Sequence, residues 1–370
     1  MAMEPASFKL PGKFARLKTW VKNNPKKSYA IAAISVIFIG GAVTATILSL
    51  QSKPAPKQEK KIAVEKKPAA PKPVYYSLLT GEQVKDKAAI NQPVTAIMIE
   101  NSPSARPQSG LKDAEIVYEA IAEGGITRFL AIYQQHKPQL IGPVRSVRPY
   151  YVDWVTPYDA SIAHVGGSKN ALAMVRNGSY RDIDQFFNGS FYWRATDRAA
   201  PHNVYTSFAK LDELNAKKGY TSSNPLPFDR VNDEKDQPVQ DATQVNLKIS
   251  STLYNSSYTY DPATKLYARS QAGQPHLDRE AGQIQARVVI GLKVNMSTVF
   301  EDGYRESIAT VGSGTAMIFQ NGHATQATWT KDAANSQLKF TDVNGQVVNL
   351  ARGTTWISAI PNQGGDISWQ

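Results

Sequence analysis

An uninterrupted apolar run of 22 residues, Tyr29 to Leu50, constrains this chain more than any other feature. The run carries no charge and follows the basic pair Lys26-Lys27. At 1.5 Å per residue a helix of this length measures roughly 33 Å, enough to cross a hydrocarbon core of about 30 Å. We therefore predict one transmembrane helix, with the lipid bilayer as a partner through Tyr29 to Leu50.

A cleavable signal peptide is the rival interpretation of this run. Its apolar core would span only about 7–15 residues and end at a small-residue cleavage site, which residues 44–46 match poorly. We predict an uncleaved signal anchor. Both flanks are basic, so the positive-inside rule separates the two orientations weakly. The N-terminal tail is short, and Glu59 and Glu65 dilute the second flank, so we place residues 1–28 in the cytoplasm and residues 51–370 outside.

The net charge of +11 lies entirely in the two flanks of the apolar run. Residues 1–28 carry a net +6 and residues 51–73 a net +5, whereas from Val74 onward 28 basic residues face 28 acidic ones. A groove that tracks phosphates needs excess positive charge in the folded part, so we expect no nucleic-acid partner. Residues 51–73 also hold five prolines, which predicts an extended, flexible linker.

The chain has no cysteine. Disulfides, zinc–thiolate sites, cysteine nucleophiles and thiol-linked lipid anchors are therefore excluded. The histidine spacing does not resemble a motif such as H-E-x-x-H, and we predict neither a metal nor a cofactor.

Periodicity in the rest of the chain predicts an α+β fold. A mixed α/β-sheet domain is expected over residues 74–235. An antiparallel β-rich domain is expected over 243–370, where short β runs meet turns such as Asn321-Gly322. Residues 224–240, with three prolines and mixed charges, mark the boundary between them.

A tight β-hairpin is predicted where two apolar runs flank a pair of glycines at 124–125. The regular register pairs Glu123 with Ile126 and Ile121 with Arg128. Side chains alternate along a strand, so Glu119, Ile121 and Glu123 would share a face, with Arg128 diagonal to both glutamates. Cross-strand ion pairing is the simpler interpretation, and an acid–base pair of glutamates is the alternative.

The run HVGGS predicts a strand over 160–165 that passes through Gly166 and Gly167 into a helix. Ser168 suits the N-cap of that helix, and Gly178 suits its end. A helix start of this kind presents unpaired amides and the positive end of the helix dipole. Gly166, Gly167 and Ser168 are therefore candidates for binding an anion, and a tight turn without a ligand is the alternative.

Arginines are concentrated in the same part of the chain. A short helix over 145–154 would place Arg145 and Arg148 on one face. With Arg128 they could clamp an anion, because a guanidinium grips phosphate or carboxylate bidentately. Internal ion pairing with nearby carboxylates is the alternative.

Histidines supply the remaining candidates. In the run RAAPHNVY, His202 can exchange protons near neutral pH, and Asn203 can orient a ligand. If the protein is an enzyme, which the sequence leaves uncertain, its catalytic candidates are His202, His164, Glu119 and Glu123. A metal held by both histidines and a carboxylate is a weaker alternative.

One further polar motif lies in the second predicted domain. His276-Leu277-Asp278 follows a Gly-Gln-Pro turn. A structural turn is the favoured interpretation, and a His or Asp contributed across the domain interface is the alternative. Trp329 and Trp356 are expected in the core.

Several long motifs together resemble the YerB-like family of bacterial extracytoplasmic lipoproteins. They are IGPVRSVRPYYVDW, HVGGS, APHNVYTS and the C-terminal run beginning VGSGTAMIFQNGHATQATW. The resemblance implies two extracytoplasmic domains and carries over no catalytic residues. The chain departs from the lipoprotein pattern because it has no cysteine to acylate, so Tyr29 to Leu50 would replace the lipid anchor.

The sequence therefore predicts a single-pass membrane protein with extracytoplasmic domains that bind an anionic cell-envelope ligand, such as a wall glycan, a polyprenyl phosphate or a carboxylate. Arg128, Arg145 and Arg148 would grip the anion. The amides of 166–168 would help, and His202 with Asn203 would orient it. The alternatives are an envelope hydrolase or phosphotransfer enzyme using the same cleft, and an envelope assembly scaffold.

Overall fold

The computed structural model describes residues 22–26, 73–178, 180–231, 240–299 and 305–370. The predicted signal anchor at Tyr29 to Leu50 and nearly all of the linker lie outside these residues. No helix within the described ranges is long and apolar enough to cross a membrane. Residues Lys72–Gln370 form one compact unit, which contains every element discussed below.

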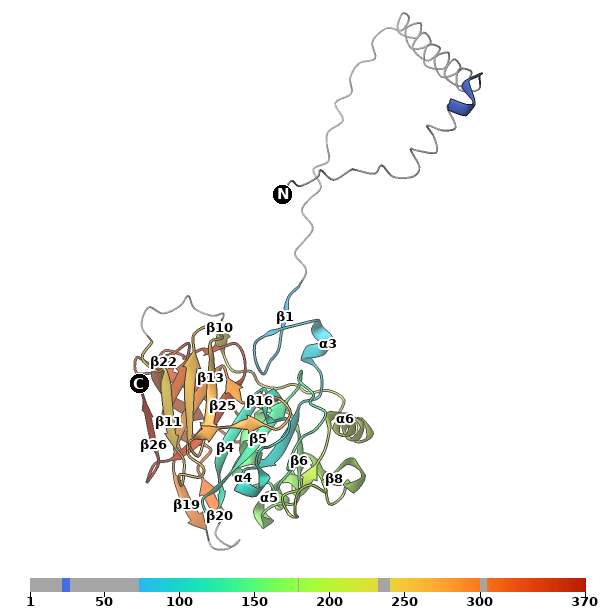
Figure 1. The fold of residues 1–370 in the computed structure, drawn as a ribbon. Coiled ribbons are helices and arrows are strands. Elements are labelled where there is room, and N and C mark those ends of the chain that lie inside the picture. The colour runs from blue at the N-terminus through green and yellow to red at the C-terminus, as the bar shows by residue number, and fades with distance from the viewer. Residues whose placement is uncertain (1–21, 27–72, 179, 232–239, 300–304) are drawn as a thin grey trace, which may run out of the picture. The chain divides into compact units, whose positions relative to one another are not determined.

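A 12-stranded mixed sheet runs through this unit (Figure 1). Its strands come from both halves of the chain in the order β23-β22-β21-β18-β25-β4-β5-β3-β6-β7, with the β19–β20 hairpin attached to β4. The N-terminal half supplies β3 (Thr95–Glu100), β4 (Ile116–Glu123), β5 (Ile126–Tyr133), β6 (Ser161–His164) and β7 (Arg181–Asp184). The C-terminal half supplies β18 (Val288–Val294), β19 (Met296–Val299), β20 (Arg305–Ile308), β21 (Gly312–Gln320), β22 (His323–Lys331), β23 (Lys339–Asp342) and β25 (Thr355–Pro361).

The direction of pairing changes along this sheet. Strands β3, β6 and β7 are parallel, and β4 and β5 form an antiparallel hairpin. The C-terminal half is mainly antiparallel, but β25 pairs parallel with both β18 and β4. The predicted mixed sheet and β-rich region are thus both present, and β25 joins them into one continuous sheet.

A second, antiparallel sheet covers one face of the first. It consists of β11 (Gln244–Lys248), β12 (Ser256–Asp261), β13 (Leu266–Gln271), β14 (Gln274–Pro275), β17 (Gln285–Ala286) and β26 (Asp366–Trp369). Apolar side chains of the two sheets form one core, which includes Val117 and Phe129 on one side and Tyr258 and Tyr267 on the other.

Helices complete the layers. On the opposite face of the large sheet, α4 (Pro149–Val155) and α5 (Lys169–Asn177) enclose a second core. Helix α6 (Phe208–Lys217) packs into the core shared by the two sheets. The short elements are β1 (Tyr75–Tyr76), β2 (Gln83–Val84), α3 (Lys87–Ile90), η1 (Pro103–Ala105), η2 (Leu111–Asp113), η3 (Thr156–Tyr158), η4 (Gly189–Phe191), β8 (Trp193–Arg194), β9 (Val204–Tyr205), β10 (Arg230–Val231), β15 (Leu277–Asp278), β16 (Gly282–Gln283) and β24 (Leu350–Ala351).

The predicted hairpin and its Glu123–Ile126 pair are confirmed, but the predicted register is wrong by one residue beyond that pair. A β-bulge between Ile121 and Glu123 makes Ile121 pair with Thr127, and Arg128 pairs with Ala120. One extra residue reverses the side-chain alternation beyond it. Glu119 therefore lies on the face of the second sheet, and Glu123 joins Arg128 on the face of α4.

The predicted helix over 145–154 begins later than expected. Helix α4 starts at Pro149, and Arg148 is its extended N-cap residue. Proline suits the first helical position and disfavours a helical residue before it. Arg145 and Arg148 therefore lie on an extended segment and contact different carboxylates. In contrast, α5 begins as predicted, because Ser168 Oγ accepts a hydrogen bond from the Ala171 amide.

Candidate functional site

Several candidate residues lie at one edge of the sheet. Strands β3, β6 and β7 are parallel, and they end at Glu100, His164 and Asp184. Carboxyl ends of parallel strands meet at the same edge, where open α/β sheets usually bind ligands. The segments that follow β6 and β7 carry Gly166, Gly167, Ser168, His202 and Asn203 among the residues singled out from the sequence.

Glu100 is the centre of a polar group at this edge. Its side chain is 5% exposed, and its Oε1 accepts from Ser102 Oγ (3.1 Å) and lies 3.5 Å from Arg145 Nε. His202 Nδ1 lies 2.8 Å from the same oxygen. A carboxylate oxygen can only accept, so Nδ1 carries the proton. Nε2 of the 26%-exposed His202 side chain makes no hydrogen bond with the described residues.

Three arginines of neighbouring segments are each held by uncharged oxygens. Arg198 donates to the carbonyls of Ser104 and Pro107. Arg106 donates to Asn101 and to the Leu253 carbonyl, and its guanidinium stacks on Tyr254 at 5.2 Å. Arg194 donates to Asn203 Oδ1 at 2.8 Å. Across the described ranges, no carboxylate forms an ion pair with any of the three.

Asn203 has a positioning role in this arrangement. It is buried, and besides accepting from Arg194 its Nδ2 donates to the carbonyls of Ala195 (3.0 Å) and Arg198 (3.2 Å). All of its side-chain contacts therefore fix the 194–203 loop.

Arg128 and Arg148 lie apart from this group. Arg128 Nη2 bonds Glu123 Oε1 at 3.1 Å, and Arg148 Nη2 bonds Glu123 Oε2. The two guanidinium groups hold the pKa of Glu123 below its usual value, although burial opposes them. Burial, reinforced by Arg128, lowers the pKa of Arg148 to about 10.

Ser168 lies near this ion cluster. Together with Arg148 it lines a cavity of about 290 Å³ that also involves Asn170, Arg305 and Glu306. The structure therefore brings Arg128, Arg148 and Ser168 to one place, and Arg145 and His202 to another.

The amides of the Gly-Gly turn have internal acceptors. Gly166 N donates to Asp184 Oδ1 (3.1 Å), and Ser168 N donates to the Val147 carbonyl (3.3 Å). A Cβ on Gly167 would lie 2.8 Å from Val147 Cγ1, so a close approach explains this glycine. The turn thus fastens the 145–148 segment to β6 and β7.

His164 lies in the interior next to this turn. Its Nδ1 is 2.8 Å from the Gly166 carbonyl, and its Nε2 is 3.0 Å from Asp182 Oδ1. Through these two contacts it joins the Gly-Gly turn to β7. Among the described residues, no group of three histidine, aspartate or glutamate side chains could hold a metal ion.

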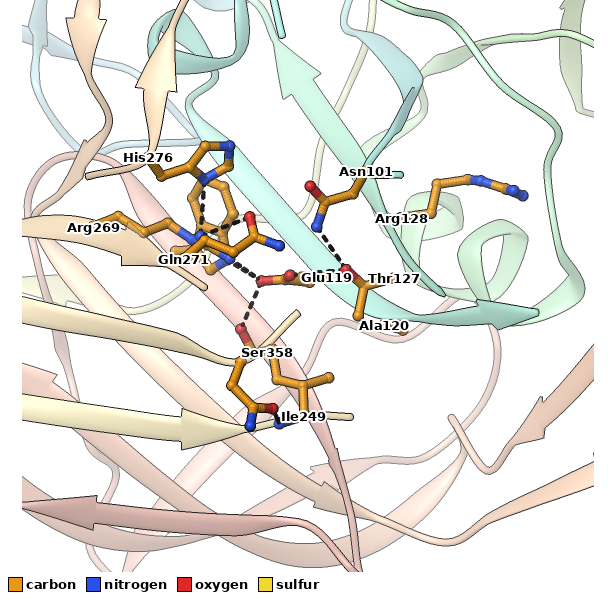
Figure 2. A network of polar contacts seen from close by, with 12 residues as sticks. Asn101, Glu119, Ala120, Thr127, Arg128, Ile249, Arg269, Gln271, His276 and Ser358 are labelled. Carbon is orange, nitrogen blue, oxygen red and sulfur yellow. Dashed lines mark hydrogen bonds and ion pairs between the residues drawn. The ribbon is translucent and has the colours of Figure 1, made fainter. Parts of the chain in front are cut away.

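A buried polar network joins the two halves of the chain (Figure 2). Glu119 and Arg269 are both fully buried and form an ion pair at 2.7 Å. Glu119 also accepts from Thr127, from Trp356 Nε1 (3.1 Å) and from Ser358. In Figure 2, Arg128 points away from Glu119, as the bulge requires.

Arg269 was not among the candidate residues predicted from the sequence. The alternation in β13 gave the available signal, because Tyr267, Arg269 and Gln271 all face inward. Although burial alone would lower the pKa of Arg269, Glu119 and Tyr258 together raise it. The ring of Trp356 lies 4.6 Å from the guanidinium carbon, so a predicted core tryptophan also contacts this charge.

His276 extends this network across the halves, as the alternative interpretation of its motif proposed. Its Nδ1 accepts from Arg269 Nη1 (2.8 Å), and its Nε2 donates to Gln108 Oε1 (2.9 Å). Burial, followed by the charge of Arg269, lowers the pKa of His276 well below its usual value, so the ring is neutral. Asp278 Oδ2 accepts from the Lys112 amide. Through these contacts of His276 and Asp278, the C-terminal half supports the loop that carries Ser102 and Arg106.

Comparisons with known proteins cover most of this compact unit. Residues 79–221 and 245–357 match the N- and C-terminal domains of a family described as "protein of unknown function (DUF3048)". The "Putative lipoprotein YerB" of Bacillus subtilis (strain 168) is 33% identical over 297 residues, which are 77% of this chain and 86% of that protein. The crystal structure of the YerB protein from Bacillus subtilis has a TM-score of 0.71 at 30% identity and covers 80% of this chain and 99% of that chain.

Proposed function

Since this chain belongs to the YerB-like family, whose two domains carry the description DUF3048, we propose its function from the geometry of its own site. It is a membrane-anchored extracytoplasmic protein that binds an anionic group of a cell-envelope molecule beside Glu100 and His202. A relative named as a lipoprotein supports the location. This chain has no cysteine, so Tyr29 to Leu50 would supply the anchor.

The observation that carries the proposal is a set of three arginines that form no ion pair with any carboxylate of the described residues. Arg106, Arg194 and Arg198 are each oriented by carbonyl or amide oxygens, which neutralise no charge. A bound phosphate or carboxylate would supply the missing counter-charge and accept charge-assisted hydrogen bonds. His202 Nε2 can accept a proton from the ligand's hydroxyl group or, once protonated, donate to its anion.

Inorganic pyrophosphate is a suitable first probe of this site. We expect it to raise the unfolding temperature of the detergent-solubilised full chain, because a ligand that binds only the folded state stabilises it. Arg198→Ala should weaken the apparent affinity about tenfold or more, since a hydrogen bond to a charged group contributes about 1.5–3 kcal/mol. Calorimetric titration gives the dissociation constants.

Lys339→Ala is the matched control, because it also removes one positive charge, from an exposed ion pair with Asp332. Pyrophosphate binding that survives Arg198→Ala and Arg106→Ala would mean that the anion binds elsewhere. A wild-type protein that no phosphate or carboxylate stabilises would leave the assembly scaffold as the remaining function.

A hydrolase is the second candidate, and the Glu100–His202 contact is the observation that favours it. Nδ1 faces the carboxylate at 2.8 Å, which orients Nε2 as a base for a water molecule. The water oxygen would attack phosphorus, its proton would pass to Nε2, and the leaving alkoxide would take that proton. Nitrophenol release from bis(p-nitrophenyl) phosphate that disappears in His202→Gln would favour this candidate over simple binding.

A further inference from the structure

Two adjacent phenylalanines project from the turn after β7. The side chains of Phe186 and Phe187 are 69% and 71% exposed, the highest values among the large apolar residues of the described ranges except Val343. Aromatic rings that are exposed to water lose the favourable free energy that burial of their apolar surface would provide. Exposed apolar patches of this kind commonly mark binding surfaces.

The backbone under these rings is held in place. Asp184, which is fully buried, accepts at Oδ1 from Gly166 N and Phe186 N, both at 3.1 Å. Its carbonyl accepts from Phe187 N and from Asn188 Nδ2. The turn therefore presents both rings from a fixed platform, which lowers the entropic cost of binding a ligand.

Each ring has a defined neighbour. Phe186 lies against Gly166, where an added Cβ would stand 3.0 Å from Cε2, so the absence of a side chain makes room for the ring. The Arg176 guanidinium lies 5.0 Å from the Phe187 ring centre and is itself held by Asp184 Oδ2 at 3.1 Å. A fixed donor thus accompanies the rings.

The ring pair lies on the same sheet edge as the anion site. The Val165 amide donates to the Arg145 carbonyl, and the Val147 amide donates to the Gly166 carbonyl, both at 3.0 Å. One extended segment therefore runs from the glycine under Phe186 to Arg145, whose side chain contacts Glu100. A single elongated ligand can reach both places.

We propose that Phe186 and Phe187 form a stacking subsite for sugar rings of the ligand, which makes that ligand an anionic glycan. This inference rests on the proposed anion site. The C–H face of a pyranose is weakly positive and complements the negative face of a phenyl ring. Polar side chains beside the rings, the exposed Arg176 and the half-buried Gln185 and Asn188, suit sugar hydroxyls. The uncharged amide groups of Gln185 and Asn188 favour a glycan over a lipid surface.

The test compares three probes on the full chain in detergent: dextran sulfate, neutral dextran and inorganic pyrophosphate. Phe186→Ala/Phe187→Ala should weaken dextran sulfate binding about tenfold, because both ring contacts with the sugar are lost. Pyrophosphate affinity should stay unchanged. Val343→Ala, which trims another highly exposed apolar side chain, is the control and should alter neither.

Unchanged dextran sulfate binding in the double variant would overturn the inference, and so would an equal loss of pyrophosphate binding. The inference also fails if the double variant loses binding to anionic phospholipid vesicles while keeping dextran sulfate, because the rings would then dock on lipid. Failure of the anion site is distinguishable. In that case the wild-type protein does not bind pyrophosphate but still binds dextran sulfate through the two rings.

Discussion

At the scale of single residues, the Glu119–Arg269 pair is the most consequential contact in the interior. Both side chains are fully buried, and the carboxylate also receives Trp356 Nε1 and two hydroxyls. Removing one member leaves the other charge buried and unpaired, which typically costs about 3–5 kcal/mol. Removing both avoids that penalty.

We therefore expect Glu119→Gln and Arg269→Met each to lower the free energy of unfolding by about 3–5 kcal/mol. The double variant should lose at least about 2 kcal/mol less than the sum of the two, because coupled residues are not additive. Urea unfolding followed by circular dichroism measures all three. Strict additivity would show that the pair is energetically independent despite its short distance.

The same pair shows which residue roles the sequence could reveal. Glu119 was a candidate acid, and its real partner lies 150 positions further along the chain. Period-two alternation places Arg269 inside the sheet, but no local pattern identifies a partner in the other half. His202 could be chosen as a candidate because histidine chemistry is recognisable in isolation. Arg106, Arg194 and Arg198 became candidates only when the fold showed that, within the described ranges, no carboxylate forms an ion pair with them.

At the scale of elements, the hairpin and α4 show where pattern reasoning succeeds and fails. Gly124 and Gly125 both have positive φ angles, so their sequence predicted a tight turn correctly. The bulge before Glu123 has no signal of its own, because apolar residues continue through it. It separates Glu119 from Arg128, whereas the predicted ion pair between Glu123 and Arg128 is present and is joined by Arg148.

Glu123 consequently fastens the hairpin to the start of α4, and this junction should be sensitive to acid. Because the pKa of Glu123 is lower in the folded protein, the folded state binds fewer protons than the unfolded state. The stabilisation that Glu123 contributes is therefore present above its unfolded pKa of about 4.3. It is lost as the pH falls through the pKa of Glu123 in the folded protein. Glu123→Gln should lower the free energy of unfolding at neutral pH. It should also make that free energy fall less steeply as the pH is lowered.

Urea midpoints recorded between about pH 3 and 7 test this expectation, over the window in which carboxylates titrate. Glu213→Gln on α6 removes an exposed carboxylate and is the control. If the urea midpoint of Glu123→Gln falls with pH as steeply as that of the wild type, other groups cause the acid sensitivity.

At the scale of the whole molecule, the two halves share one sheet. Sequence patterns predicted both halves and the family, and the family matches confirm the resemblance. The pairing of β25 with β4 was not predictable, because strand partners more than 200 residues apart leave no local trace. Through that pairing, and through the Arg269–Glu119 and His276–Gln108 contacts, the C-terminal half supports the candidate site.

This architecture predicts that the halves unfold together. Strand β4 has β5 on one side and β25 on the other, so opening either half exposes the core of both. We expect one cooperative urea transition for residues 72–370 within the full chain, with slow-exchanging amides in β5 and in β21 reporting the same opening free energy. Arg269→Met, a change in the C-terminal half, should accelerate exchange in β5 as much as in β21. Protection of β5 that survives Arg269→Met while β21 opens would instead mean that the two halves are independent folding units, each stabilised by its own part of the sheet.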